Sequence, residues 1–299
     1  MTRSTESGAA ARLPLLAALA LLCNALVWGV SWWPFRFLAG HGLHPLWSTA
    51  LVYGLALLVI MAWRPQALRQ LLAHPALWGI ALASGCTNAA FNWAVTIGEV
   101  VRVVLLFYLS PLWTLLLARW LLDEPIRTRA VLRVLLALLG AALVLGSGAG
   151  GLAWQGVGPA ELLGLLGGAS FALNNALLLR EADQPEEGRA LAMFGGGALV
   201  SALLALGAVP GSMAALPALQ MSWLGPLLLL ALAFLAGNLA LQYGAARLPA
   251  NVTAVIMPTE IVFASVSAVW LGGEVLRPAV LTGGALILTA SLLAARDGA

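Results

Sequence analysis

The sequence has 299 residues, of which 62% are hydrophobic and only 9% charged, and its mean hydropathy is +0.96. An ordinary globular chain has about 25% charged residues, so the composition excludes a soluble protein and predicts an all-α, polytopic membrane protein. The net charge of +3 comes from scattered arginines without any lysine, which argues against a nucleic-acid partner. The sequence has no Gly-x-x-x-x-Gly-Lys loop, no metal-ligand cluster and no nucleophile paired with a base. We therefore expect no cofactor, no metal, no catalytic residue and no enzymatic activity.

The membrane-spanning segments follow from the apolar runs, since a transmembrane helix needs about 20 mostly apolar residues. The first run is longer than the roughly 7–15 apolar residues of a signal-peptide core, so we expect an uncleaved first helix. Short connections between the runs make consecutive helices antiparallel neighbours. The ten predicted spans are 13–37, 44–63, 76–97, 100–121, 128–147, 159–180, 189–208, 223–246, 250–271 and 277–295.

Arginines are distributed unequally between the two sides that these spans define. Only Arg36, Arg102 and Arg277 fall on one side, and the other twelve fall on the opposite side. Cytoplasmic connections carry an excess of basic residues, so both termini are predicted to be cytoplasmic and the protein to lie in a bacterial inner membrane. The twelve arginines on the cytoplasmic side are Arg3, Arg12, Arg64, Arg69, Arg119, Arg127, Arg129, Arg133, Arg180, Arg189, Arg247 and Arg296.

The fourth span contains a proline in the middle of an apolar helix, in the stretch FYLSPLWTLLLARWLLDEP at 107–125. Proline removes a backbone hydrogen bond and clashes with the preceding turn, so this helix is expected to bend near Pro111. Pro258 is expected to bend the ninth span at a corresponding depth. The two bends are interpreted either as gates that widen a central cavity or as kinks that membrane helices tolerate without a function.

The second half of the chain repeats the first at an offset of 150 residues. Within the fourth and ninth spans the identical pairs are Ala118/Ala268, Trp120/Trp270, Leu121/Leu271 and Glu124/Glu274, and in the third and eighth spans Asn88 matches Asn238. Because each unit has five spans, an odd number, the second unit enters the membrane from the opposite side. Such inverted repeats are a common construction of secondary transporters. We expect a first repeat at 1–147, a periplasmic linker at 148–158 and a second repeat at 159–299.

The order of these motifs resembles the EamA-type transporters of the drug/metabolite transporter (DMT) superfamily. The resemblance depends on the early Trp28-Gly29, on a fourth span running from Pro111 to Glu124, and on the ninth-span sequence TEIVFASVSAVWLGGE. Ile261 stands where the family pattern has proline. The resemblance implies ten helices in two five-helix repeats, around a central cavity lined mainly by helices 1, 3, 4, 6, 8 and 9. Within the family the chain is most similar to the aromatic amino-acid exporters (YddG-type).

Polar and aromatic side chains recur within particular spans, although polar groups are unfavourable at lipid depth unless they face a cavity or one another. Amides there are interpreted either as interhelical hydrogen-bonding groups or as the lining of a cavity. An amide and aromatic lining suits a zwitterion with an apolar side chain, and also a lipophilic cation. The predicted substrate-binding residues are Asn24, Trp28, Ser31, Asn88, Asn92, Trp93, Tyr108, Ser110, Asn174, Asn238, Gln242 and Tyr243.

Glu260 is the one acidic residue near the middle of a span, and it is a candidate for proton coupling or for binding an amine. The structural alternative is that it accepts hydrogen bonds from backbone freed near Pro258. Glu99 and Arg102 are three residues apart at the outer end of the fourth span, where we expect a local ion pair.

These features favour a secondary transporter that exports small metabolites, most of all aromatic or neutral amino acids, by alternating access. The expected partners are a small-molecule substrate and the lipid bilayer. The competing hypotheses are an uncoupled facilitator or channel, an exporter of lipophilic cations, and a membrane enzyme or lipid-handling protein. The sequence marks no dedicated dimer face.

Overall fold

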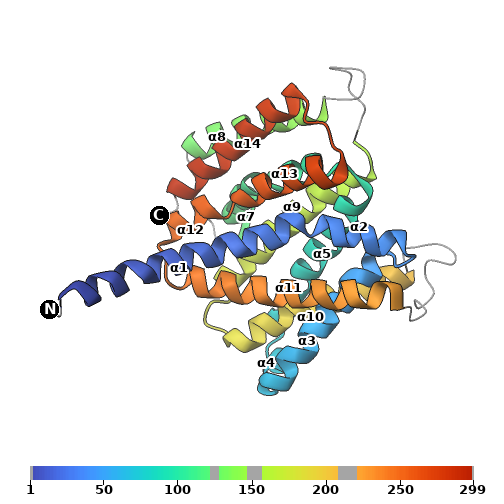
Figure 1. Ribbon diagram of the computed structural model, residues 1–299, viewed down its shortest axis with the longest axis vertical. Helices are drawn as coiled ribbons and strands as arrows, with labels where there is room; N and C mark the ends of the chain where they lie inside the picture. Colours follow the sequence, from blue (N-terminus) through green and yellow to red (C-terminus); the bar gives the residue numbers. More distant parts are fainter. Residues whose placement is uncertain (1–2, 122–127, 147–156, 208–220, 298–299) are drawn as a thin grey trace.

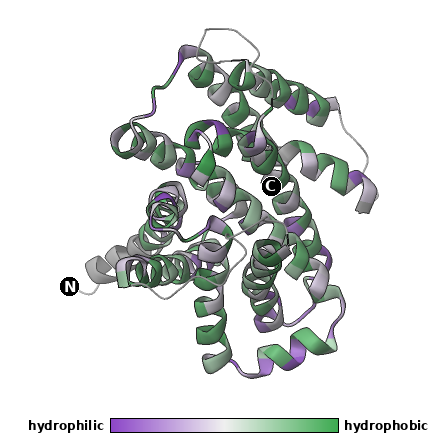
Figure 2. Ribbon diagram, turned by 90° about the vertical axis from the view of Figure 1, so that its right-hand side faces the viewer, coloured by the Kyte–Doolittle hydropathy of each residue, from purple (hydrophilic) through white to green (hydrophobic). Residues whose placement is uncertain are grey.

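A computed structural model describes residues 3–121, 128–146, 157–207 and 221–297. Within these ranges the chain forms fourteen helices and no strand, and the helices pack side by side in one bundle (Figure 1). Hydrophobic residues recur along the length of the helices (Figure 2). The helices are α1 (Arg3–Val30), α2 (Trp32–Gly40), α3 (Pro45–Trp63), α4 (Gln66–Ala73), α5 (Ala76–Ile97), α6 (Val100–Phe107), α7 (Ser110–Leu121), α8 (Thr128–Leu145), α9 (Pro159–Arg180), α10 (Glu186–Gly207), α11 (Met221–Ala245), α12 (Ala250–Ile256), α13 (Thr259–Gly272) and α14 (Pro278–Asp297).

Seven stretches of the described residues are long and apolar enough to cross a membrane. The all-helical class is therefore confirmed, and the hydropathy of these stretches agrees with a membrane protein. Helices also cover the predicted spans 76–97, 250–271 and 277–295, but these are not among the seven, and the number of ten crossings stays a prediction. The seven stretches are Pro14–Gly40, Pro45–Trp63, Val100–Leu117, Thr128–Leu145, Pro159–Arg180, Glu186–Gly207 and Met221–Ala245.

Three of the predicted spans are interrupted, each close to a proline. The first is broken at Ser31, between α1 and α2, the fourth at Tyr108 and Leu109, and the ninth at Met257 and Pro258. A proline at position i cannot donate to the carbonyl of residue i−4. Pro34 and Pro111 are placed so that the missing bonds fall at the breaks between α1 and α2 and between α6 and α7. The short helix α4 lies in a stretch where the sequence predicts only a connection.

Glycines allow several helices to approach one another closely. A Cβ atom added to Gly168 of α9 would lie 2.5 Å from the carbonyl oxygen of Phe107, the group that Pro111 leaves without its helical donor. A Cβ atom on Gly29 of α1 would lie 2.7 Å from the carbonyl oxygen of Glu260 on α13. Only glycine fits such positions without a shift of the backbone. These contacts bring α9 against the end of α6, and α1 against the start of α13.

The helix contacts define the arrangement of the bundle. Helix α5 packs against α9 and α10, α1 packs against α11 and α13, and α3 packs against α10 and α11. Helices α8 and α14 lie side by side at one edge of the bundle (Figure 1). The beginning of α1 and the end of α14 lie toward the same end of the bundle (Figure 1).

Candidate functional site

The two later helix interruptions are joined by a hydrogen bond between Tyr108 and Glu260. Tyr108 follows the last residue of α6. Helix α13 begins directly after Pro258, and Glu260 lies in its first turn. The Tyr108 hydroxyl donates to Oε2 of Glu260 at 3.0 Å, across 152 residues of sequence. Glu260 is only 8% exposed. A helix N-terminus carries partial positive charge, so the start of α13 and the Tyr108 hydroxyl together offset part of the cost of burying a carboxylate at this position.

Aromatic rings form a continuous wall near this pair. The Trp28 ring centroid lies 4.7 Å from that of Phe234 and 6.2 Å from that of Phe91. Phe91 in turn lies 4.9 Å from Phe107, the residue before Tyr108. The rings come from α1, α5, α6 and α11. Of these, the sequence predicted only Trp28 as a site residue, and Phe91 and Phe107 are adjacent to predicted polar residues, which is the one signal that would have found them.

The predicted amides in α1 and α5 link neighbouring helices. Nδ2 of Asn24 donates to the carbonyl oxygen of Gly237 on α11 at 2.9 Å. Nδ2 of Asn92 donates to Oγ1 of Thr49 on α3 at 3.2 Å. Asn88 accepts a hydrogen bond from the hydroxyl of Tyr53 on the same helix as Thr49. These amides therefore serve as interhelical hydrogen-bonding groups, which is one of the two roles the sequence left open.

Three buried asparagine oxygens have no hydrogen-bond partner among the described residues. They are Oδ1 of Asn24, Asn92 and Asn174. Asn24 and Asn174 are separated by 150 residues, the offset of the predicted repeat. A buried polar atom without a partner is unfavourable, so these oxygens are available to a polar ligand or to water.

The remaining predicted residues do not converge on the Tyr108–Glu260 pair. Gln242 is exposed and donates to Oδ1 of Asn238 on its own helix at 2.8 Å. The Tyr243 ring lies under the guanidinium of Arg247, 3.8 Å from its centroid. These three side chains of α11 contact residues of their own helix or of the turn that follows it.

Three other predicted residues make contacts that do not involve the pair. The Ser31 hydroxyl donates to the carbonyl of Trp28 at 2.8 Å. The Trp93 ring packs edge-on against His44 at 5.2 Å. Ser110 begins α7, and its carbonyl accepts the Thr114 hydroxyl at 3.0 Å.

A second polar region lies at the end of the bundle that the sequence assigns to the outer side. The expected local ion pair between Glu99 and Arg102 is wrong, because each side chain pairs with the other half of the chain. Folding brings the starts of α6 and α9 and the α13–α14 connection together, and the sequence separation of three residues carries no information about that. The ion pairs are Arg36–Glu274 at 3.5 Å, Arg102–Glu161 at 3.1 Å and Arg277–Glu99 at 3.7 Å.

Comparison with known proteins finds a family match in the first half of the chain. Residues 15–146 match the EamA-like transporter family, so the first half of the chain contains an EamA-like transporter domain of the DMT superfamily. This is a family of multi-pass membrane transporters and not of enzymes, which implies a small-molecule substrate and membrane lipid as partners.

A solved structure extends the likeness to the whole fold. A structure described as "Crystal structure of protein" aligns over 93% of this chain and 95% of its own, with a TM-score of 0.55 and 21% sequence identity. At that identity the likeness shows the fold alone. No curated protein matches the sequence.

Proposed function

We propose that the protein is a secondary transporter that exports small metabolites from the cytoplasm by alternating access, with aromatic and other neutral amino acids as its substrates. The observation that carries the proposal is the hydrogen bond between Tyr108 and Glu260, which joins the interrupted helix of one half to that of the other. Interrupted helices at the membrane midplane form the substrate and ion sites of many transporters. The EamA-like domain at 15–146 supports the same class.

Alternating access requires two halves that can exchange conformations, and the helix contacts support two inverted repeats. In the predicted repeat, α5 corresponds to α11, α9 to α1 and α10 to α3. Exchanging the halves therefore turns the contact of α5 with α9 into that of α11 with α1. It also turns the contact of α5 with α10 into that of α11 with α3. Both members of each pair are present. The breaks also correspond, since α6 ends at Phe107 and α12 at Ile256, 149 residues later. We assign the repeats to 1–147 and 159–299, with the linker at 148–158.

The substrate class follows from the chemistry around Glu260. A carboxylate recognises the ammonium group of an amino acid, and the rings of Trp28, Phe91 and Phe234 offer apolar surface to an aromatic side chain. The unpartnered oxygens of Asn24 and Asn174 are further buried hydrogen-bond acceptors in the bundle. We therefore place the aromatic amino-acid exporters (YddG-type) first among the relatives whose activity this protein shares.

A lipophilic cation is the second candidate substrate. The same carboxylate beside aromatic rings suits an organic cation, because such rings attract positive charge through their faces. The two classes differ in the carboxylate, which an amino acid has and a cationic dye lacks.

The predicted topology places both termini in the cytoplasm of a bacterial cell, with the protein in the inner membrane. An even number of crossings returns the chain to its starting side, and the beginning of α1 and the end of α14 lie toward one end of the bundle (Figure 1). The twelve-to-three division of arginines then assigns that end to the cytoplasm.

The test is flux through proteoliposomes with a panel of labelled amino acids and cationic dyes, with and without imposed pH and voltage gradients. We expect phenylalanine, tryptophan or tyrosine to be transported, to show counterflow and to respond to a gradient. Transport of dyes alone would favour the second substrate class. Flux without counterflow at rates beyond conformational cycling would indicate a channel and contradict the proposal.

A further inference from the structure

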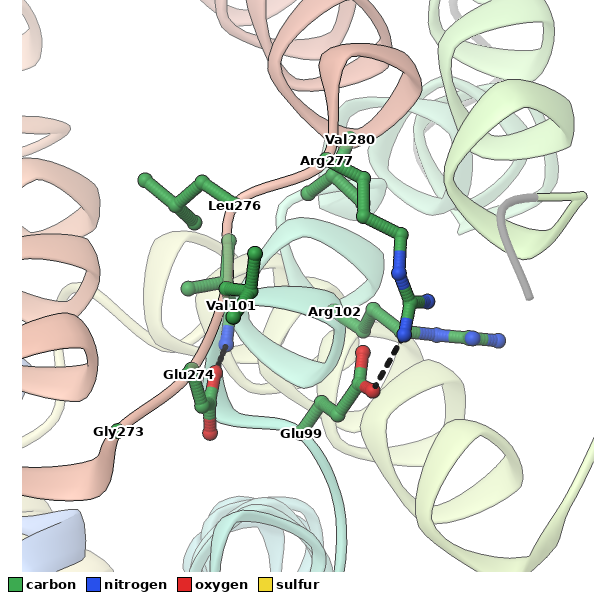
Figure 3. A pocket seen from close by; sticks show the side chains of 9 residues that line it. Glu99, Val101, Arg102, Gly273, Glu274, Leu276, Arg277 and Val280 are labelled. Carbon is green, nitrogen blue, oxygen red and sulfur yellow. Dashed lines mark hydrogen bonds and ion pairs between the residues drawn. The ribbon is translucent and has the colours of Figure 1, made fainter. Parts of the chain in front are cut away.

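A pocket with both acidic and basic walls opens at the predicted outer end of the bundle. It has a volume of about 280 Å³ and lies between the start of α6 and the connection from α13 to α14. Four of its nine lining residues are charged, and four are valine or leucine (Figure 3). The lining residues are Glu99, Val101, Arg102, Gly273, Glu274, Val275, Leu276, Arg277 and Val280.

The carboxylate of Glu274 is already bound by other groups of the protein. Its Oε1 accepts the backbone N–H of Val100 at 2.7 Å, and its Oε2 accepts that of Val101 at 3.3 Å, which caps the start of α6. Arg36 pairs with the same carboxylate at 3.5 Å and donates to the carbonyl of Val95 at the end of α5. These contacts satisfy both oxygens, so Glu274 shapes the pocket and has little capacity left for a ligand.

Arg102 has one hydrogen-bond donor without an acceptor among the described residues. Its side chain is almost fully buried, with 5% of the residue exposed, and its Nη2 pairs with Glu161 at 3.1 Å. Its Nε is also buried and has no hydrogen-bond partner among the described residues. A buried guanidinium with an unused N–H favours an anionic acceptor beside it.

The pair formed by Arg277 and Glu99 is the most exposed of the three ion pairs. Their ionic groups are 3.7 Å apart, beyond hydrogen-bonding distance, and the side chains are 31% and 49% exposed. Arg277 reaches from the α13–α14 connection toward Glu99, on the side of the pocket where Arg102 also lies (Figure 3). Exposed ion pairs are weak, so a ligand can separate these two groups and pair with each.

We propose that this pocket is an outer binding site for the zwitterionic head group of a neutral amino acid. The ligand carboxylate lies between Arg102 and Arg277, the ammonium group binds Glu99, and the side chain contacts Val101 and Leu276. The inference deepens the proposed function, on which it rests, since it adds a site on the side where an exporter releases its substrate.

The charge balance of the region favours a zwitterion over a simple ion. Arg36, Arg102 and Arg277 are matched by three acids, Glu99, Glu161 and Glu274. A net anion or cation would upset this balance, whereas a zwitterion replaces one ion pair by two. The apolar side of the pocket then selects ligands whose side chain is uncharged.

The experiment measures binding of labelled L-phenylalanine to the purified full-length protein, with phenylpropionate and phenethylamine as ligands that lack one charge. We expect Arg277→Gln and Glu99→Gln to remove one of two binding components or weaken it about tenfold, an effect typical of a lost charged contact. Both single-charge ligands should bind that component about tenfold more weakly than phenylalanine. Arg69→Gln, at an exposed position of α4, is the matched control and should bind as the wild type does.

The outcomes separate the pocket from the proposed function. Binding that is unchanged in both variants overturns the pocket, and so does phenylpropionate binding that equals phenylalanine binding. Binding that depends on Arg277 and Glu99 supports the pocket even when proteoliposomes show no amino-acid flux, a result that would overturn only the proposed function. Both substituted side chains are partly exposed, so the variants are expected to fold.

Discussion

The carboxyl group of Glu260 is held within an apolar bundle by a single phenol side chain and the start of a helix. An ionised acid at the centre of a membrane is unfavourable by about 2.5–3.5 kcal/mol on insertion scales. A hydrogen bond to a charged group offsets about 1.5–3 kcal/mol of that. Because the two terms are similar in size, we expect proton binding at Glu260 to respond to movements that make or break the contact with Tyr108.

Substitutions at this pair separate the carboxyl from its donor. Glu260→Gln keeps the shape but cannot exchange a proton, so transport should lose its dependence on an imposed pH gradient. Tyr108→Phe keeps the carboxyl and should retain that dependence, with a rate about tenfold lower because one hydrogen bond is lost. Initial rates in proteoliposomes at several gradients measure both effects. A Glu260→Gln protein that still responds to the gradient would exclude this residue from coupling.

The sequence indicated single members of the candidate site but not their partners. Tyr108, Glu260 and Trp28 were each predicted separately, but their neighbours are set by helices far apart in the chain. Glu99 and Arg102 show the same limit, since proximity in sequence suggested the wrong pair. Phenylalanines in apolar spans have no distinguishing signal, and Phe234 was missed for that reason.

Helix ends and interruptions were partly predictable from local chemistry. The bounds of α5 and α9 coincide with the predicted spans 76–97 and 159–180, because proline, glycine and charged residues flank both. The sequence predicted bends at Pro111 and Pro258 but not the break at Ser31. Pro34, three residues later, supplies its physical cause, since it cannot donate to the carbonyl of Val30.

Close packing of α5 and α10 depends on Gly196. A Cβ atom there would overlap the carbonyl oxygen of Ala81. Gly196→Ala should therefore destabilise the protein by about 1–3 kcal/mol, as overpacking does. Gly54 on α3 has no atom within 4 Å of its Cβ position, so Gly54→Ala should instead stabilise by about 0.5–1 kcal/mol through helix propensity. Melting temperatures in detergent test both, and equal values for the two variants would contradict this packing.

The cap of α3 makes stability depend on pH. His44, just before the span Pro45–Trp63, accepts the Leu46 N–H at Nδ1, and burial lowers the pKa of His44 from its usual 6.5. Above pH 6.5 the imidazole is neutral whether the chain is folded or unfolded. As the pH falls below 6.5, the unfolded chain binds a proton that the folded chain binds only at lower pH, so stability decreases.

The matched variant for this cap is His44→Asn, because asparagine is also a good N-cap and does not titrate. The wild type should lose more melting temperature than His44→Asn between about pH 7 and pH 5. Melting curves in detergent across this range give the difference. Parallel pH profiles for the two proteins would show that the imidazole contributes nothing.

At the scale of the whole molecule, ion pairs join the two halves at both ends of the bundle. The predicted outer end has three such pairs, and all three arginines of the arginine-poor side take part. At the other end Glu187 accepts hydrogen bonds from Gln66 and Gln70 and lies 3.7 Å from Arg64. The outer set is more buried, so we expect it to hold the two halves together more firmly than the exposed set does at the other end.

Opening toward the outside should therefore become easier when an outer pair is broken. Glu274→Gln removes the charge that faces Arg36 and keeps an oxygen to cap α6. The reporter is Ser267→Cys in a protein without Cys23 and Cys86, because Ser267 is buried and accepts the Trp32 N–H at 2.9 Å between α2 and α13. Labelling by an impermeant maleimide added outside should become about fivefold faster with Glu274→Gln, as expected for an ion pair contributing about 1 kcal/mol.

Glu187→Gln, which weakens the opposite end, should not accelerate labelling. Equal acceleration by both variants would indicate general loosening of the bundle and would contradict an outer closure built from these ion pairs.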